Sequence, residues 1–86
     1  MFIPTKYIKI NTNGHDKIIV FSGLIQHKEF KNLNPISAGF ISIGATIQDG
    51  HPITDCTCYG KSDSLGIDSA PEDTELAKKQ ILGIIF

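Results

Sequence analysis

The chain begins with two short runs whose residue pattern is typical of β-strands. Residues 6–10, Lys-Tyr-Ile-Lys-Ile, mix polar and apolar positions, and residues 17–21, Lys-Ile-Ile-Val-Phe, are rich in β-branched side chains. The polar segment between them contains Asn13-Gly14, a pair suited to the positive φ angles of a tight hairpin turn. This combination predicts a β-hairpin.

The next segment has a roughly helical spacing of apolar residues. Ser22 can cap a helix that continues to about Leu33, because a serine hydroxyl accepts a hydrogen bond from the first free N–H groups of a helix. Asn34-Pro35 ends it, since the residue before a proline is disfavoured in the helical region. Four residues are expected on its buried side: Leu24, Ile25, Phe30 and Leu33.

Further strands are expected in the second half of the chain. Residues 36–47 carry apolar residues at both odd and even positions, which predicts a central strand covered by helices on one face and by a partner on the other. Asp49-Gly50 marks a turn. Residues 53–59 and 64–67 are then expected as two more strands.

The last helix has the most specific start signal. Residues 69–72, Ser-Ala-Pro-Glu, combine the serine and glutamate of a capping box with an early proline. This pattern predicts that Ser69 caps the helix. One stripe of the helix is then formed by Leu76, Ala77, Gln80, Ile81 and Ile84.

These elements follow one another in the order ββαβββα, which is typical of the α+β class. We expect one small domain over residues 1–86, built as a two-layer sandwich. Its mainly antiparallel sheet has about five strands, and both helices pack on one face. An 86-residue chain buries a limited core, so self-association is one expected source of additional stability.

The charged residues exclude some partners. Eight lysines, no arginine and nine acidic residues give a net charge of −1. Arginine is the side chain that most often binds phosphate groups and the edges of guanine bases, so a nucleic-acid partner is disfavoured. The lysines are dispersed and no apolar run approaches the ~20 residues of a membrane span, so we expect no membrane partner. Without a secretory leader pattern, the expected location is the cytoplasm.

His51, Asp55, Cys56 and Cys58 form the first candidate site, because thiolates and imidazoles are preferred ligands of zinc and copper. The geometry of a straight strand argues against a metal site here. It places Cys56 and Cys58 ~6.6 Å apart on one face, whereas two sulfurs on one zinc lie ~3.8 Å apart. The cysteines are therefore interpreted as small buried core residues, and a metal-binding or thiol-redox site that uses both cysteines with His51 is the alternative hypothesis.

Two other polar segments lack a complete catalytic pattern. Residues 26–29, Gln-His-Lys-Glu, are typical of a solvated helix face. Residues 59–66 resemble a phosphate-binding loop only in Gly-Lys-Ser, because Asp55 occupies the place of the first glycine that such a loop needs. Without a nucleophile–base pair or a cofactor loop, the sequence favours a non-catalytic binding or protein-interaction domain without a cofactor, acting as a homo-oligomer.

Residues 81–86, Ile-Leu-Gly-Ile-Ile-Phe, are apolar at five of six positions. The helix stripe accounts for Ile81 and Ile84 but not for all the others. We expect a homodimer in which Ile84, Ile85 and Phe86 lie at the interface. The alternative is that the segment turns at Gly83 and covers the sheet of its own chain.

Overall fold

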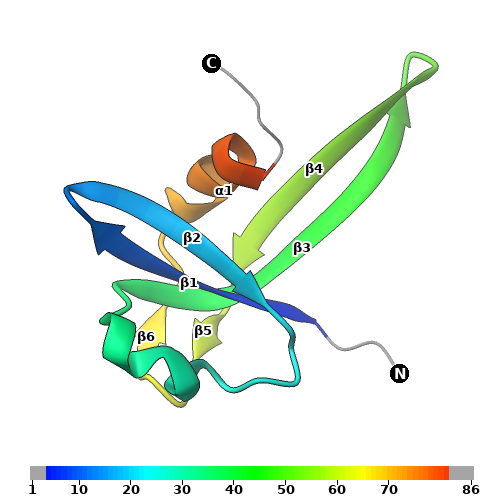
Figure 1. Ribbon diagram of the computed structural model, residues 1–86. Helices are drawn as coiled ribbons and strands as arrows, with labels where there is room; N and C mark the ends of the chain where they lie inside the picture. The colour runs from blue at the N-terminus through cyan, green and yellow to red at the C-terminus, as the bar shows by residue number, and fades with distance from the viewer. Residues whose placement is uncertain (1–3, 82–86) are drawn as a thin grey trace.

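The computed structural model describes residues 4–81, without the side chains of residues 45 and 46 (Figure 1). It confirms a small α+β domain. The elements in chain order are β1 (Thr5–Thr12), β2 (His15–Phe21), the 3-10 helix η1 (His27–Leu33), β3 (Ser37–Gln48), β4 (His51–Tyr59), β5 (Lys61–Ser62), β6 (Ile67–Asp68) and α1 (Asp73–Ile81).

The main sheet is antiparallel and has the strand order β2-β1-β3-β4, while β5 and β6 form a separate two-stranded ribbon. The sequence predicted about five strands in a single sheet. The difference arises after β4, where Gly60 adopts a φ of 78°. This left-handed conformation turns the chain out of the sheet before β5 begins.

Both long hairpins turn in the same way. Asn13 and Gly14 have φ angles of 54° and 81°, and Asp49 and Gly50 have φ angles of 51° and 79°. Positive φ at both central residues is the geometry of a type I′ turn, whose twist matches that of the flanking strands. The predicted first hairpin and the predicted turn at residues 49–50 are therefore confirmed.

The first helix is shorter than predicted. Ser22 closes a turn by accepting the N–H of Leu24 at 3.2 Å, and the helix begins only at His27. Leu24, Ile25 and Leu33, which were expected to be buried, are exposed, and Leu24 is 77% exposed. Their spacing is too irregular to place them on one side of a helix, so the buried residue of η1 is His27.

The two helices lie on opposite faces of the sheet, and the prediction that both share one face was wrong. On one face α1 contributes to the core cluster of Tyr7, Ile18, Ile41, Cys56 and Ala77. On the other, the His27 ring of η1 packs edge-on against Phe21 and Phe40 at centroid distances of 5.5 and 6.0 Å. Alternate strand residues point to opposite faces, and each helix covers one set.

Helix α1 lies between the two edge strands of the curled sheet (Figure 1). Gln80 Oε1 accepts the Ile18 N–H of β2 at 2.7 Å, and Thr74 Oγ1 accepts the Cys58 N–H of β4 at 2.9 Å. A sheet edge carries unpaired backbone groups that can recruit other strands. One helix thus satisfies donors on both edges.

The start of α1 differs by one residue from the predicted cap. The Ala70 N–H donates to Asp73 Oδ2 at 3.0 Å, and the Asp73 N–H donates to the Ala70 carbonyl at 3.0 Å. Asp73 therefore makes the return contact expected of a capping box, but to Ala70 rather than to Ser69. The Ser69 hydroxyl instead interacts with Tyr7.

The β3–β4 hairpin extends beyond the rest of the sheet (Figure 1). Pairing between β1 and β3 reaches Ile41, whereas β3 and β4 stay paired up to Gln48 and His51 at the turn. Residues 42–57 therefore form a two-stranded projection, which we call the arm.

Two glycines of β3 provide a test of the packing at the base of the arm. A Cβ on Gly39 would overlap the Tyr59 carbonyl oxygen, while a Cβ on Gly44 would meet no atom within 4 Å. We expect Gly39→Ala to destabilise the protein by about 1–3 kcal/mol, as overpacking does, and Gly44→Ala to stay within about 0.5 kcal/mol of the wild type. Urea unfolding midpoints measure both, and equal midpoints for the two variants would contradict the packing at Gly39.

Candidate functional site

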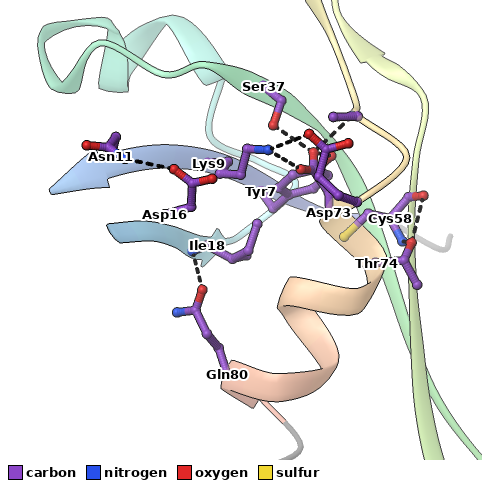
Figure 2. A network of polar contacts seen from close by, with 12 residues as sticks. Tyr7, Lys9, Asn11, Asp16, Ile18, Ser37, Cys58, Asp73, Thr74 and Gln80 are labelled. Carbon is purple, nitrogen blue, oxygen red and sulfur yellow. Dashed lines mark hydrogen bonds and ion pairs between the residues drawn. The ribbon is translucent and has the colours of Figure 1, made fainter. Parts of the chain in front are cut away.

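A cluster of buried polar side chains surrounds Asp73 at the start of α1 (Figure 2). Asp73 Oδ1 lies 2.7 Å from Lys9 Nζ. Asp73 Oδ2 accepts the Tyr7 hydroxyl and the Ser37 hydroxyl, each at 2.6 Å. Lys9 is also 3.4 Å from the exposed carboxylate of Glu72. The cluster joins β1, β3 and α1.

Strand geometry explains how these side chains meet. Tyr7 and Lys9 are two residues apart on β1 and share a face, and Ser37 of β3 is the register partner of Lys9. Asp73 enters this face from the first turn of α1. Sequence reasoning missed the cluster, and the available signal was Lys9, a lysine on the same strand face as the apolar Tyr7.

The charges of the pair are stabilised by their contacts. Burial alone raises the pKa of Asp73, but hydrogen bonds from Lys9, Ser37, Tyr7 and the Ala70 N–H lower that pKa below its ordinary value of 3.8. Burial likewise lowers the pKa of Lys9, while the contact with Asp73 outweighs it and raises the pKa above 10.5. Burial, followed by the Asp73 charge, raises the pKa of Tyr7. The cluster therefore holds an ion pair and a neutral phenol.

The cluster is closed to ligands. Tyr7 and Asp73 are 0% exposed, Ser37 is 2% exposed and Lys9 is 3% exposed. A substrate cannot reach groups buried to this extent, because Asp73 Oδ2 already accepts two hydroxyls and Oδ1 faces the ammonium group of Lys9. The arrangement therefore supports a structural role, which is to hold α1 on β1 and β3.

The residues predicted as a metal or thiol site are not gathered at one point. Cys56 and Cys58 are free thiols on the face that α1 covers, and Cys56 is buried. His51 is exposed at the far end of β4, and Cys56 lies five positions further along the strand, a span of ~16 Å. Asp55 pairs with Lys78 at 3.5 Å. Among the described residues, no group of three His, Cys, Asp or Glu side chains could hold a metal ion.

The two thiols also lie in surroundings that disfavour thiolates. Burial, followed by the Asp73 charge, raises the pKa of Cys58 to about 12. Burial is also the largest cause that raises the pKa of Cys56, with a further contribution from Asp55. Because the thiolate is the nucleophile and the metal ligand, these environments favour unreactive core thiols.

An open cavity of about 730 Å³ lies near η1, on the side of the domain away from α1. Its lining comes from Lys6, Phe40 and residues 26–27, together with Gly60, Lys61, Asp63 and Ser64. The structure thus brings together the two polar segments considered separately in the sequence. His27, expected on a solvated face, is buried and 4% exposed.

One face of the arm is apolar and exposed. Ile43 and Ile47 alternate on β3, opposite Cys56 and Pro52 of β4. Ile43 is 47% exposed and Ile47 is 80% exposed. This face, defined by Ile43, Ile47 and Pro52 and called the arm face, continues the core face beyond α1. The predicted interface residues Ile84, Ile85 and Phe86 lie outside the described residues.

Comparison of the chain with protein-family models, with curated proteins and with solved structures found no match in any of the three. Within residues 4–81, no helix is long and apolar enough to span a bilayer. The proposals below therefore rest on the geometry of the chain alone.

Replacing Asp73 tests the ion pair. Asp73→Asn leaves Lys9 buried without its closest counter-charge, and we expect a loss of about 3–5 kcal/mol of unfolding free energy. Glu72→Gln is the matched control, because the Glu72 side chain is 68% exposed, and we expect its unfolding midpoint in urea to stay near that of the wild type.

The same variant should also change how the unfolding free energy depends on pH in the acid range. The pKa of Asp73 is lower in the folded protein than its ordinary value of 3.8, so the ionised carboxylate stabilises the folded state at pH values above 3.8. This stabilisation is lost as the pH falls through the lower pKa of the folded protein. Asp73→Asn should lack this part of the pH dependence in urea unfolding. A variant with the acid dependence of the wild type would show that Asp73 is not the group responsible.

The thiols provide an independent test of burial. We expect Cys56 and Cys58 to react slowly with a thiol reagent near neutral pH and quickly in urea, because burial raises both thiol pKa values. A cysteine introduced by Gly44→Cys, at a position with open space around it, is the reactive control. Labelling of the native thiols at the rate of this control would contradict the buried arrangement.

Proposed function

We propose that this protein is a non-catalytic interaction domain that acts as a homodimer and assembles through the arm face. The observation that carries the proposal is the exposure of Ile47 and Ile43 on one side of a projecting ribbon. Contiguous apolar surface on a small protein marks an interaction site more often than isolated apolar residues do. The proposal includes a cytoplasmic location, where free thiols stay reduced.

The faces of the arm are better suited to association than the edge of β4. The Cys56 N–H donates to Asp55 Oδ1 at 2.9 Å and the Cys58 N–H donates to Thr74, so neither is free to pair with another strand. Pro52, on the same edge by strand alternation, has no N–H. Strand addition at β4 is therefore disfavoured, and a partner is expected to pack against side chains.

The size of the arm face indicates what else the interface must include. Six residues of a two-stranded ribbon cover about 200 Å². A stable interface buries about 800 Å² per partner. The aromatic ring of Phe86 adds ~150–250 Å², and Leu82, Ile84 and Ile85 add ~100 Å² each. The arm face and residues 82–86 together approach the area of a stable dimer, whereas neither does so alone.

Helix α1, which residues 82–86 follow in the chain, points towards the tip of the arm. Thr74 contacts Cys58, and one helical turn later Lys78 contacts Asp55, so α1 runs antiparallel to β4 and towards the tip of the arm. Five further residues reach up to ~17 Å. The arm face from Cys56, opposite Ile43, to Pro52 spans only ~13 Å.

A second copy of the chain is the proposed occupant. Side chains of adjacent residues point in different directions, so Ile84 and Ile85 are not both expected to pack on the arm face of their own chain. In a two-fold dimer, residues 82–86 of one chain cover the arm face of the other, and the remaining apolar side chains meet at the axis. Ile84, Ile85 and Phe86 thus remain the proposed interface residues.

Two substitutions on opposite faces of the arm test the dimer. Ile47→Thr removes apolar surface from the arm face of both chains, and we expect the dimer dissociation constant to rise more than about tenfold. Ile53→Thr is the control, because Ile53 lies on the opposite face and is 39% exposed. Sedimentation over a concentration series measures both. A wild-type monomer at high micromolar concentration would refute the homodimer.

A chain that ends at Ile81 tests the contribution of residues 82–86. We expect it to fold with α1 intact, because the contacts of Thr74, Lys78 and Gln80 remain, but to sediment as a monomer. If the truncated chain still dimerises, residues 82–86 are not part of the interface. If Ile47→Thr then dissociates this shorter dimer, the arm face remains the interface.

A further inference from the structure

The cavity near η1 is formed by two segments that are far apart in the sequence. Gln26 and His27 line one side, and residues 60–64 line the other, with Lys6 and Phe40 contributing from the sheet. Its volume of about 730 Å³ falls within the ~300–1,000 Å³ typical of sites for small molecules. The cavity shares no residue with the arm.

The walls of the cavity are held in place. The Lys28 N–H donates to Ser64 Oγ at 3.2 Å, which connects η1 to the turn between β5 and β6. Gly60 adopts a φ of 78°, and a Cβ there would lie 2.9 Å from the Phe40 ring. The chain passes so close to Phe40 that glycine is required. A ligand would therefore enter a preformed site.

The lining contains one buried polar side chain with a remaining hydrogen-bonding atom. His27 Nε2 lies 2.8 Å from the Gly39 carbonyl oxygen, which can only accept, so Nε2 carries the hydrogen. In the tautomer with its hydrogen on Nε2 alone, Nδ1 is an acceptor, and Nδ1 makes no hydrogen bond to any residue of the described part. This 4%-exposed ring lines the cavity and offers an acceptor to a ligand.

Two lysines, Lys6 and Lys61, line the cavity. Lys6 Nζ donates to the Ile25 carbonyl at 3.0 Å, which uses one of its three donors. Lys61 Nζ is 3.8 Å from Asp63 and its side chain is 67% exposed. Two positive charges and one negative charge favour an anion here, although the whole chain carries a net charge of −1.

We propose that this cavity binds a small planar anion, a ring that carries a carboxylate or phosphate group and a hydrogen-bond donor. The ring packs over Phe40, the donor reaches His27 Nδ1, and the anionic group lies between Lys6 and Lys61. The polar atoms set the orientation, and the aromatic surface supplies the contact area. The site does not depend on the dimer.

Ligand titration with matched probes tests the site. The probes are para-hydroxybenzoate, para-hydroxyphenyl phosphate and the neutral para-hydroxybenzamide, followed through the ring proton signals of His27 by NMR. For ligands of this size we expect dissociation constants of ~1–10 mM for an anion that fits. The stronger of the two anions identifies carboxylate or phosphate as the recognised group, and the amide should bind several-fold more weakly.

Lysine variants assign the charge contribution. Lys61→Gln and Lys6→Gln should each weaken binding of the better anion by about two- to fivefold, as expected for partly exposed charges. Lys17→Gln, an exposed lysine of β2 outside the cavity, is the matched control and should have no effect. The proposal is overturned if neither anion shifts the His27 signals at ~10 mM, if the amide binds equally well, or if Lys17→Gln has the same effect as Lys61→Gln.

Discussion

The fold depends on the contact between Asp73 and Lys9, which joins the first strand to the last helix across the whole chain. Removing two charges from water costs several kcal/mol per ion, and here the ion pair and the hydroxyls of Tyr7 and Ser37 offset that cost. Because a buried carboxylate is tolerated only where these donors converge, Asp73 defines one position for α1 on the sheet. The apolar contacts of Ala77 alone would allow the helix to shift along the sheet.

That position of α1 determines which surfaces remain available. With Asp73 in place, Thr74 reaches the N–H of Cys58 on one edge of the sheet and Gln80 reaches the N–H of Ile18 on the other. Both edges then have donors satisfied within the chain, so association through added strands is disfavoured. The end of the helix points along β4 towards the arm, and no described residue covers the apolar arm face beyond it.

The buried polar groups around Asp73 therefore share no residues with the two proposed binding surfaces. The Asp73 cluster and Cys56 are buried under α1 and Cys58 is half-buried there, and their pKa shifts follow from burial and from mutual contacts. The arm face and the cavity near η1 are both open to solvent and lie outside that cluster. A self-association surface and a small-molecule site can thus coexist in a domain of this size without competing for residues.

Local patterns in the sequence determined β1 to β4, both type I′ turns and the final helix, whereas the strand predicted at residues 64–67 is mostly the turn between β5 and β6. A turn depends on the φ preference of residues such as Asn13-Gly14, and an amphipathic helix depends on a spacing of three to four residues. The tertiary structure decided that α1 and η1 lie on opposite faces, that His27 is buried and that Lys9 pairs with Asp73. It also brought residues 26–27 and 60–64 into one cavity. The Lys9–Asp73 pair and the cavity require contacts between residues more than 30 positions apart, and His27 is buried by Phe21, Gly39 and Phe40 from neighbouring elements. Burial by another element leaves no periodic signal in the sequence near either partner.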